Sequence, residues 1–168
     1  MGENQNATPG RASQRRDRLI REREHDTYKV RGKLPGPTVC PECGAIYRDG
    51  RWVWGSTPAG ANQVPCPACQ RVRDRYPGGY LALSGGFLAE HREEIIALAH
   101  NVEARAKQQH PLKRLMGIEE SEDAIEITVT HPNLARAIGE AVRHAYQGEL
   151  DFHYTEDENV LRVRWDRS

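Results

Sequence analysis

The sequence contains no apolar stretch that approaches the roughly 20 residues needed to cross a bilayer. Of its 168 residues, 38% are hydrophobic and the mean hydropathy is −0.77, so we expect a modest core with part of the chain outside it. The N-terminal segment MGENQNATPGRASQRR lacks the apolar region of a secretory signal peptide. These absences predict a protein that resides in the reducing cytoplasm and has no membrane partner.

Familiar catalytic motifs are also missing. The sequence has no glycine-rich loop followed by Lys-Ser or Lys-Thr, no GxSxG elbow and no HExxH helix. Its seven histidines are scattered along the chain. We therefore expect a protein that is not an enzyme.

Cysteine is scarce, but its four copies form two pairs of identical spacing, Cys40-Pro-Glu-Cys43 and Cys66-Pro-Ala-Cys69. A C-x2-C pair places two thiolates on one tight turn, and two such turns supply the four ligands of a tetrahedral Zn²⁺ site. Gly44 can adopt the positive φ that such a turn requires. Iron is a weaker alternative, and disulfides would need an oxidising compartment. The spacing predicts a structural Zn²⁺ bound by all four cysteines, with no coordination position open for a catalytic water.

The net charge of zero conceals an asymmetry between the two halves of the chain. Residues 1–79 hold 14 basic and 8 acidic side chains, a net charge of +6, whereas residues 80–168 hold 10 and 16, a net charge of −6. Twenty of the 24 basic residues are arginine, whose planar fork suits phosphate. A GC-rich genome would raise the arginine content equally well, so the composition permits a basic face without requiring one.

Aromatic and basic side chains are interleaved around the cysteine pairs. Trp52 and Trp54 are two residues apart, so we expect both indoles on one face of a short strand. Aromatics among arginines suit stacking on unpaired bases and binding of phosphates. The alternative is that the tryptophans cover the metal and pack on the next domain, while the arginines neutralise the −2 charge of four thiolates around Zn²⁺. The residues predicted to contact nucleic acid are Arg48, Arg51, Trp52, Trp54, Arg71, Arg73 and Arg75.

The pattern divides the chain into three parts. Residues 1–37 are polar and arginine-rich, and we expect a basic, disordered arm in which residues 14–26 could become helical on a partner. Residues 38–79 form the four-cysteine zinc ribbon. From residue 80 onward, apolar residues recur with the periods of helices and strands, which predicts a separate α+β domain over residues 80–168.

Within that domain the expected order is β-α-β-β-α-β-β. Strands are expected at 80–84, 113–119 and 124–130, a long helix at 87–109, a second helix from Pro132 to Gly148, and two strands at the end of the chain. The first six elements match a ferredoxin-like sandwich, an antiparallel sheet with two helices on one face. The other face would be exposed or meet a partner, and the residues expected there are Glu126, Thr128, Thr130, Asp151, His153, Arg162 and Arg164.

Four stretches carry a resemblance to a known family. They are Cys40-Pro-Glu-Cys43-Gly, Tyr47-Arg-Asp-Gly-Arg-Trp-Val-Trp54, Cys66-Pro-Ala-Cys69 and Thr130-His-Pro-Asn-Leu-Ala-Arg-Ala-Ile-Gly139. In this order the chain resembles small bacterial zinc-ribbon proteins, which are similar to the N-terminal region of the archaeal and eukaryotic large-ribosomal-subunit export adaptor. The resemblance implies a zinc-dependent protein that contacts the large ribosomal subunit or its RNA. The further cysteine knuckles and the export tail of the adaptor are absent here, so nuclear export is not implied.

Two classes of function follow from these observations. The first is a non-enzymatic, zinc-stabilised RNA- or ribosome-binding protein, in which the basic half contacts phosphate. The second is a protein–protein adaptor that docks through the ribbon and the acidic α+β domain. Binding to several phosphates weakens steeply as salt is added, whereas an apolar protein interface does not, so salt dependence separates the two.

Overall fold

The computed structural model describes residue 28, residue 34, residues 36–155 and residues 159–168 of the chain. The expected basic arm, with its segment 14–26, therefore falls almost wholly outside the described residues. Within the described part of the chain, no helix is both long enough and apolar enough to cross a membrane.

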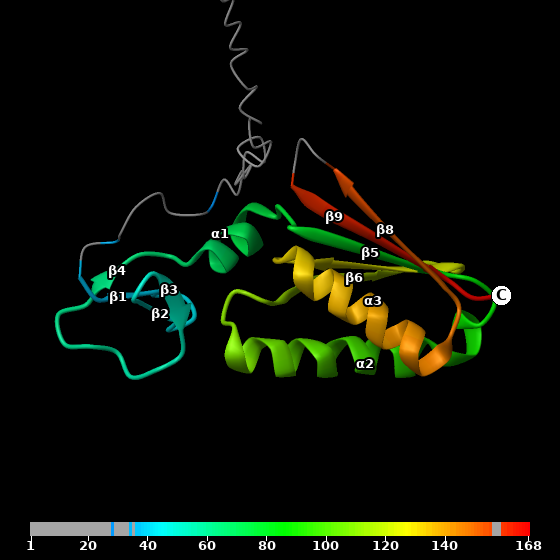
Figure 1. Cartoon of the computed structure of the whole chain (residues 1–168), viewed down its shortest axis with the longest axis horizontal. Coiled ribbons are helices and arrows are strands. Elements are labelled where there is room, and N and C mark those ends of the chain that lie inside the picture. The colour runs from blue at the N-terminus through cyan, green and yellow to red at the C-terminus, as the bar shows by residue number, and fades with distance from the viewer. Residues whose placement is uncertain (1–27, 29–33, 35, 156–158) are drawn as a thin grey trace, which may run out of the picture.

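The cysteine-containing part forms a small four-stranded sheet followed by a short helix (Figure 1). The strand order is β3-β2-β1-β4, and β1 pairs antiparallel with β2 but parallel with β4. Between the two cysteine pairs, β2 and β3 form an antiparallel hairpin. The elements are β1 (Thr38–Val39), β2 (Ile46–Arg48), β3 (Arg51–Val53), β4 (Asn62–Gln63) and α1 (Pro67–Asp74).

From residue 79 onward the described chain is α+β, as expected, with both long helices on one face of a five-stranded sheet (Figure 1); this part is called the α+β domain below. The predicted sequence of elements is present in full, and the long helix ends at Gln109 as predicted. The elements are β5 (Gly79–Ser84), α2 (Leu88–Gln109), β6 (Leu115–Glu120), β7 (Ala124–Val129), α3 (Pro132–Tyr146), β8 (Glu149–Thr155) and β9 (Val160–Asp166).

The strand order of this sheet, β6-β7-β5-β9-β8, differs from a ferredoxin-like order. A ferredoxin-like sheet would place β8 directly beside β5, but the last strand β9 lies between them and runs parallel to β5. The sheet is therefore mixed and not purely antiparallel. Burial explains why β9 takes the place beside β5 that β8 would have in a ferredoxin-like sheet. Strand β9 buries Val160, Leu161, Val163 and Trp165, whereas β8 leaves most of its side chains exposed. The more apolar strand occupies the position that is covered on one face and paired on both edges.

The core of the domain lies between the sheet and the two helices. Fifteen buried residues contribute to it, all of them between Leu81 and Trp165. The opposite face of the sheet carries polar side chains, as expected, and also Tyr80, whose ring lies under the Arg162 guanidinium at 4.4 Å. Thr130 does not belong to that face, because it is buried and its hydroxyl donates to the Leu112 carbonyl at 2.6 Å.

Candidate metal centre and nucleic-acid interface

The four cysteines, which lie between residues 40 and 69 of the chain, come together at one point. Their four sulfur atoms all lie within 4.8 Å of one another, and the Sγ atoms of Cys43 and Cys66 are 3.7 Å apart. Four sulfurs at the usual Zn–S length of about 2.3 Å are separated by about 3.8 Å in a regular tetrahedron. None of the cysteines forms a disulfide. Cys40, Cys66 and Cys69 are buried and Cys43 is half-buried, so the group is a closed site that fits a metal ion.

Local backbone structure explains how the two pairs present their sulfurs. Gly44 has a φ of +79°, which confirms the expected left-handed turn after the first pair. In the second pair, Cys66 is the N-cap of α1, and the proline after it starts the helix. The Cys66 amide donates to Cys40 Sγ at 3.2 Å, and the Cys69 amide donates to Cys66 Sγ at 3.4 Å. The Cys69 N–H group favours the thiolate form of Cys66.

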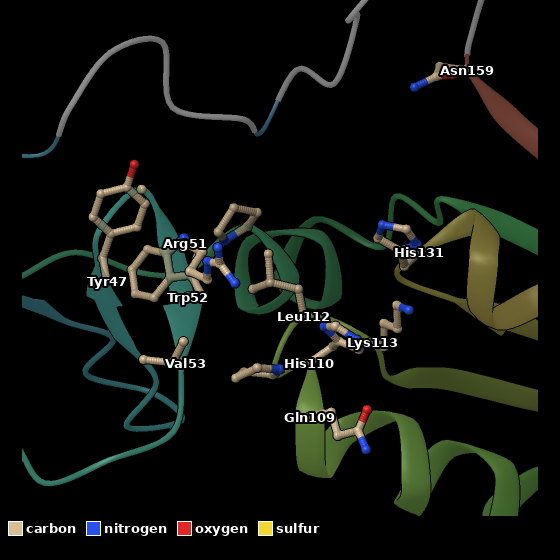
Figure 2. A pocket seen from close by; sticks show the side chains of 13 residues that line it. Tyr47, Arg51, Trp52, Val53, Gln109, His110, Leu112, Lys113, His131 and Asn159 are labelled. Carbon is tan, nitrogen blue, oxygen red and sulfur yellow. The ribbon is translucent and has the colours of Figure 1, made fainter.

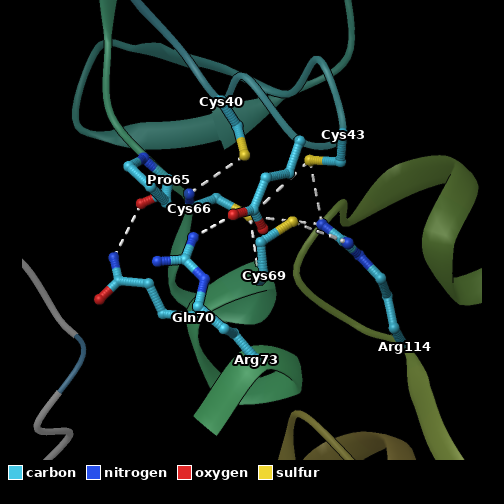
Figure 3. A network of polar contacts seen from close by, with 9 residues as sticks. Cys40, Cys43, Pro65, Cys66, Cys69, Gln70, Arg73 and Arg114 are labelled. Atoms are coloured by element: carbon cyan, nitrogen blue, oxygen red, sulfur yellow. Dashed lines mark hydrogen bonds and ion pairs between the residues drawn. The ribbon is translucent and has the colours of Figure 1, made fainter.

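A side chain from the α+β domain also reaches the cysteines (Figure 3). Arg114, the residue before β6, donates from Nη1 to Cys69 Sγ at 3.2 Å, and from Nη2 to Cys43 Sγ at 3.1 Å and Cys66 Sγ at 3.3 Å. Its Nε donates to the Pro111 carbonyl at 2.8 Å, which fixes the plane of the guanidinium. The single positive charge of Arg114 thus lies against three of the four sulfurs and offsets part of their negative charge.

The ionisation of the thiols reflects these contacts. The hydrogen bond from Cys66 and, to a smaller extent, the nearby guanidinium of Arg114 lower the pKa of Cys43 to about 4. The same hydrogen bond, together with burial, raises the pKa of Cys66. Burial raises the pKa of Cys69 to about 11, against the opposing effect of Arg114. In the metal-free protein some thiols therefore keep their protons, and a bound metal ion would have to displace them.

Of the two tryptophans, only Trp52 lies within a strand, because β3 ends before Trp54. Trp52 is buried, with only 9% of its surface exposed, and packs with the cysteines and against Tyr47, whose ring centroid is 5.4 Å away. Trp54 lies beyond the end of β3, and its Nε1 donates to the Lys107 carbonyl at 2.6 Å. The strand that carries Trp52 is therefore shorter than the two-residue spacing of the tryptophans predicts.

The arginines after the second pair also differ from the predicted arrangement. Their two-residue spacing would align them in an extended segment, but residues 67–74 form α1 and distribute them around a helix. Arg71 donates to the Tyr76 carbonyl at 3.1 Å and lies 4.7 Å from the centre of the Tyr28 ring. Arg73 forms an ion pair with Glu42. Arg75 ends the helix in a left-handed conformation with a φ of +52°.

The other predicted arginines, Arg48 and Arg51, come together at the tip of the β2–β3 hairpin. They are directly opposite each other across the two strands, and both are exposed. The two residues between them, Asp49 and Gly50, have φ values of +50° and +82°, as a type I′ turn requires. Among the described residues, no carboxylate forms an ion pair with either guanidinium. The hairpin thus holds two like charges side by side at its tip.

Sequence reasoning did not identify Arg114 as part of the site. It is 45 residues from Cys69, and no motif connects the two. The pairing of Arg48 with Arg51 had a local signal in the sequence, because Asp-Gly between two short strand-forming segments is typical of a two-residue hairpin turn.

The chain matches no family model, no curated protein and no solved structure. The chemistry of the site therefore rests on the residues described above.

Proposed function

We propose that this chain is a non-enzymatic, zinc-stabilised protein of the cytoplasm that binds RNA, with the ribosome and its large subunit as the expected target. The metal centre folds the ribbon, and the ribbon presents a cationic hairpin. The proposal combines the resemblance of the motifs with the arrangement of charge in the described residues.

Zinc is the metal that the four sulfurs favour. Four thiolates in a closed, approximately tetrahedral group are the usual ligands of structural Zn²⁺, and they leave no position open for a substrate. Arg114 and two backbone amides already hydrogen-bond the sulfurs, as expected of the groups that surround metal ligands. We infer that Cys40, Cys43, Cys66 and Cys69 bind one Zn²⁺.

The observation that carries the RNA proposal is the exposed pair of Arg48 and Arg51. Like charges directly opposite each other on a two-stranded ribbon are destabilising, and here no carboxylate of the described chain offsets them by an ion pair. A phosphate bound between the two guanidinium groups would remove that repulsion and accept hydrogen bonds from both. Regular spacing of phosphates makes RNA a ligand that can use this pair and the neighbouring basic residues together.

Co-sedimentation with ribosomal particles tests the proposal. The full-length zinc-loaded protein should pellet with the large subunit in native lysate, and nuclease treatment should release it. RNA recovered with the protein should be ribosomal. Recovery of the same protein partners after complete nuclease digestion, with no RNA dependence, would contradict the proposal.

The alternative, a protein–protein adaptor, is favoured by a different feature. Strand β8 is the outer strand of the large sheet, and it leaves Phe152 and Tyr154 exposed at 38% and 45% of their surfaces. An exposed strand edge with aromatic side chains suits pairing with a strand of another protein. Binding of that kind would persist at high salt, which distinguishes it from contact with phosphate.

A further inference from the structure

A cleft of about 580 Å³ separates the β2–β3 hairpin from the α+β domain (Figure 2). One wall is formed by the hairpin, of which β3 is the outer strand of its sheet. The opposite wall is formed by the loop between α2 and β6, with residues from Gln109 to Lys113, and by His131 before α3. The volume of the cleft is in the range of sites that hold a small organic molecule. The cleft is distinct from the metal centre, whose cysteines are absent from its lining.

The charge of the cleft is of one sign. Arg51 enters it from the hairpin and Lys113 from the opposite loop, and the imidazoles of His110 and His131 lie on the same side as Lys113. None of the described residues that line it is acidic. The absence of acidic residues is notable on the wall that the second half of the chain supplies, because residues 80–168 carry 16 acidic and 10 basic side chains. An anion in the cleft would meet hydrogen-bond donors from both walls and no opposing carboxylate.

The cleft also has an aromatic and apolar surface. Tyr47 and Trp52 meet edge to face on the hairpin side, and Leu112 lies across from them (Figure 2). Tyr47 and Leu112 are both partly exposed. A free inorganic anion would leave this surface unused. A ligand with a planar ring and a phosphate would use both the apolar surface and the cations.

We infer that the cleft holds one unpaired nucleotide of a bound RNA strand. The phosphate lies between Arg51 and Lys113, and the base packs against the hairpin wall at Tyr47. Arg51 belongs both to the cleft and to the exposed pair with Arg48, so the strand continues from the cleft to the hairpin tip. This inference rests on the proposed function, and it names the part of the RNA that is recognised. A base in a duplex is stacked and paired, so it cannot enter the cleft.

The test uses the full-length, zinc-loaded protein and three probes: a short single-stranded RNA that contains 5-bromouridine, the duplex of the same sequence, and uridine monophosphate. The single strand should bind most tightly, and ultraviolet crosslinking should attach it to Tyr47 or to the loop at Gln109–Lys113. Lys113→Gln should reduce the slope of log affinity against log salt by about 0.7. Tyr47→Leu should weaken binding by about 5- to 150-fold, the range for loss of one stacked base.

Lys107→Gln is the matched control, because Lys107 is exposed on α2 and does not line the cleft. Zinc content should equal that of the parent in each variant, and Lys113→Gln leaves the aromatic packing near the metal intact. The inference is overturned if crosslinks form only outside the cleft, or if uridine monophosphate binds and the strand does not. It is also overturned if Lys113→Gln and Tyr47→Leu both bind RNA as tightly as the parent does, while replacement of Arg48 and Arg51 weakens binding. In that case the proposed function still stands. Absence of RNA binding by the parent would overturn both.

Discussion

Arg114 donates from Nη2 to Sγ of Cys43 at 3.1 Å, although the two residues belong to different parts of the fold and are 71 positions apart in the chain. The guanidinium is held in place from its own side, because its Nε and backbone N–H bind Pro111 and Thr130. Arg114 therefore connects the metal centre to the α+β domain, and contacts within that domain fix the position of its guanidinium.

Arg114→Gln tests this connection. The change removes a positive charge and three hydrogen bonds to sulfur, so we expect zinc affinity to fall by about 10- to 100-fold, the usual effect of losing a partner of the metal ligands. Competition with a chromogenic chelator measures the affinity. Arg114→Lys should lose less zinc affinity than Arg114→Gln, because lysine keeps the positive charge although it lacks the planar fork. Arg105→Gln, at an exposed position on α2, should have no effect.

Metal analysis tests the cysteine assignment itself. The parent should contain one Zn²⁺ per chain, and Cys66→Ser should lose it, because one buried thiolate of four is replaced by a poor zinc ligand. Removal of zinc by a chelator should unfold the ribbon, since structural zinc supplies on the order of 10–16 kcal/mol of apparent binding free energy in small fingers. A Cys66→Ser protein that retains a full equivalent of zinc and melts as the parent does would refute the assignment.

The α+β domain should fold without the ribbon. All fifteen buried residues of its core lie between Leu81 and Trp165, so residues 79–168 alone should show a cooperative thermal transition and the helix signal of α2 and α3 by circular dichroism. The fragment should be unaffected by chelators. Its stability should be below that of the same domain in the full chain, because Leu112 and Arg114 lose their contacts with the ribbon. A disordered fragment would show that the two parts share one folding unit.

Gly139→Ala tests the position of the last strand. A Cβ atom at residue 139 would lie 2.7 Å from Val163 Cγ1 on β9 and 3.1 Å from Leu150 Cδ1 on β8. Overpacking of this kind costs about 1–3 kcal/mol, although alanine is the better helix former by about 1 kcal/mol. We expect a net loss of stability in urea denaturation. Gly86→Ala, where the nearest atom would be 3.8 Å away, is the control and should be close to neutral.

The sequence predicted the elements of the α+β domain because each one buries a single face. The apolar residues of α2 and α3 recur at helical spacing and meet the sheet, and the inner residues of β7 alternate with exposed ones. The order of the strands could not be predicted in the same way. β8 and β9 both alternate, and only their packing shows that β9 is covered by α3 while β8 is left at the edge.

The candidate site was predictable where the signal was local. Two C-x2-C pairs locate the metal ligands from spacing alone, and their four sulfurs converge as expected. The roles of the arginines depended on structure that the spacing did not reveal, because a helix that begins at Pro67 distributes Arg71 and Arg73 around its axis. Arg114 and Lys113 approach from a distant loop, so their relation to the ribbon exists only in the folded chain.

The most direct test of the account is RNA binding across a salt series, with the parent compared with the double variant Arg48→Gln/Arg51→Gln. Glutamine preserves a long polar side chain at each exposed position and removes the charge, so the ribbon should keep its zinc. If each arginine contacts one phosphate of a single strand, the slope of log affinity against log salt should decrease in magnitude by about 1.4, or about 0.7 per contact. Arg105→Gln should leave the slope unchanged. A flat salt response in the parent, or a double variant with the affinity and slope of the parent, would contradict the account.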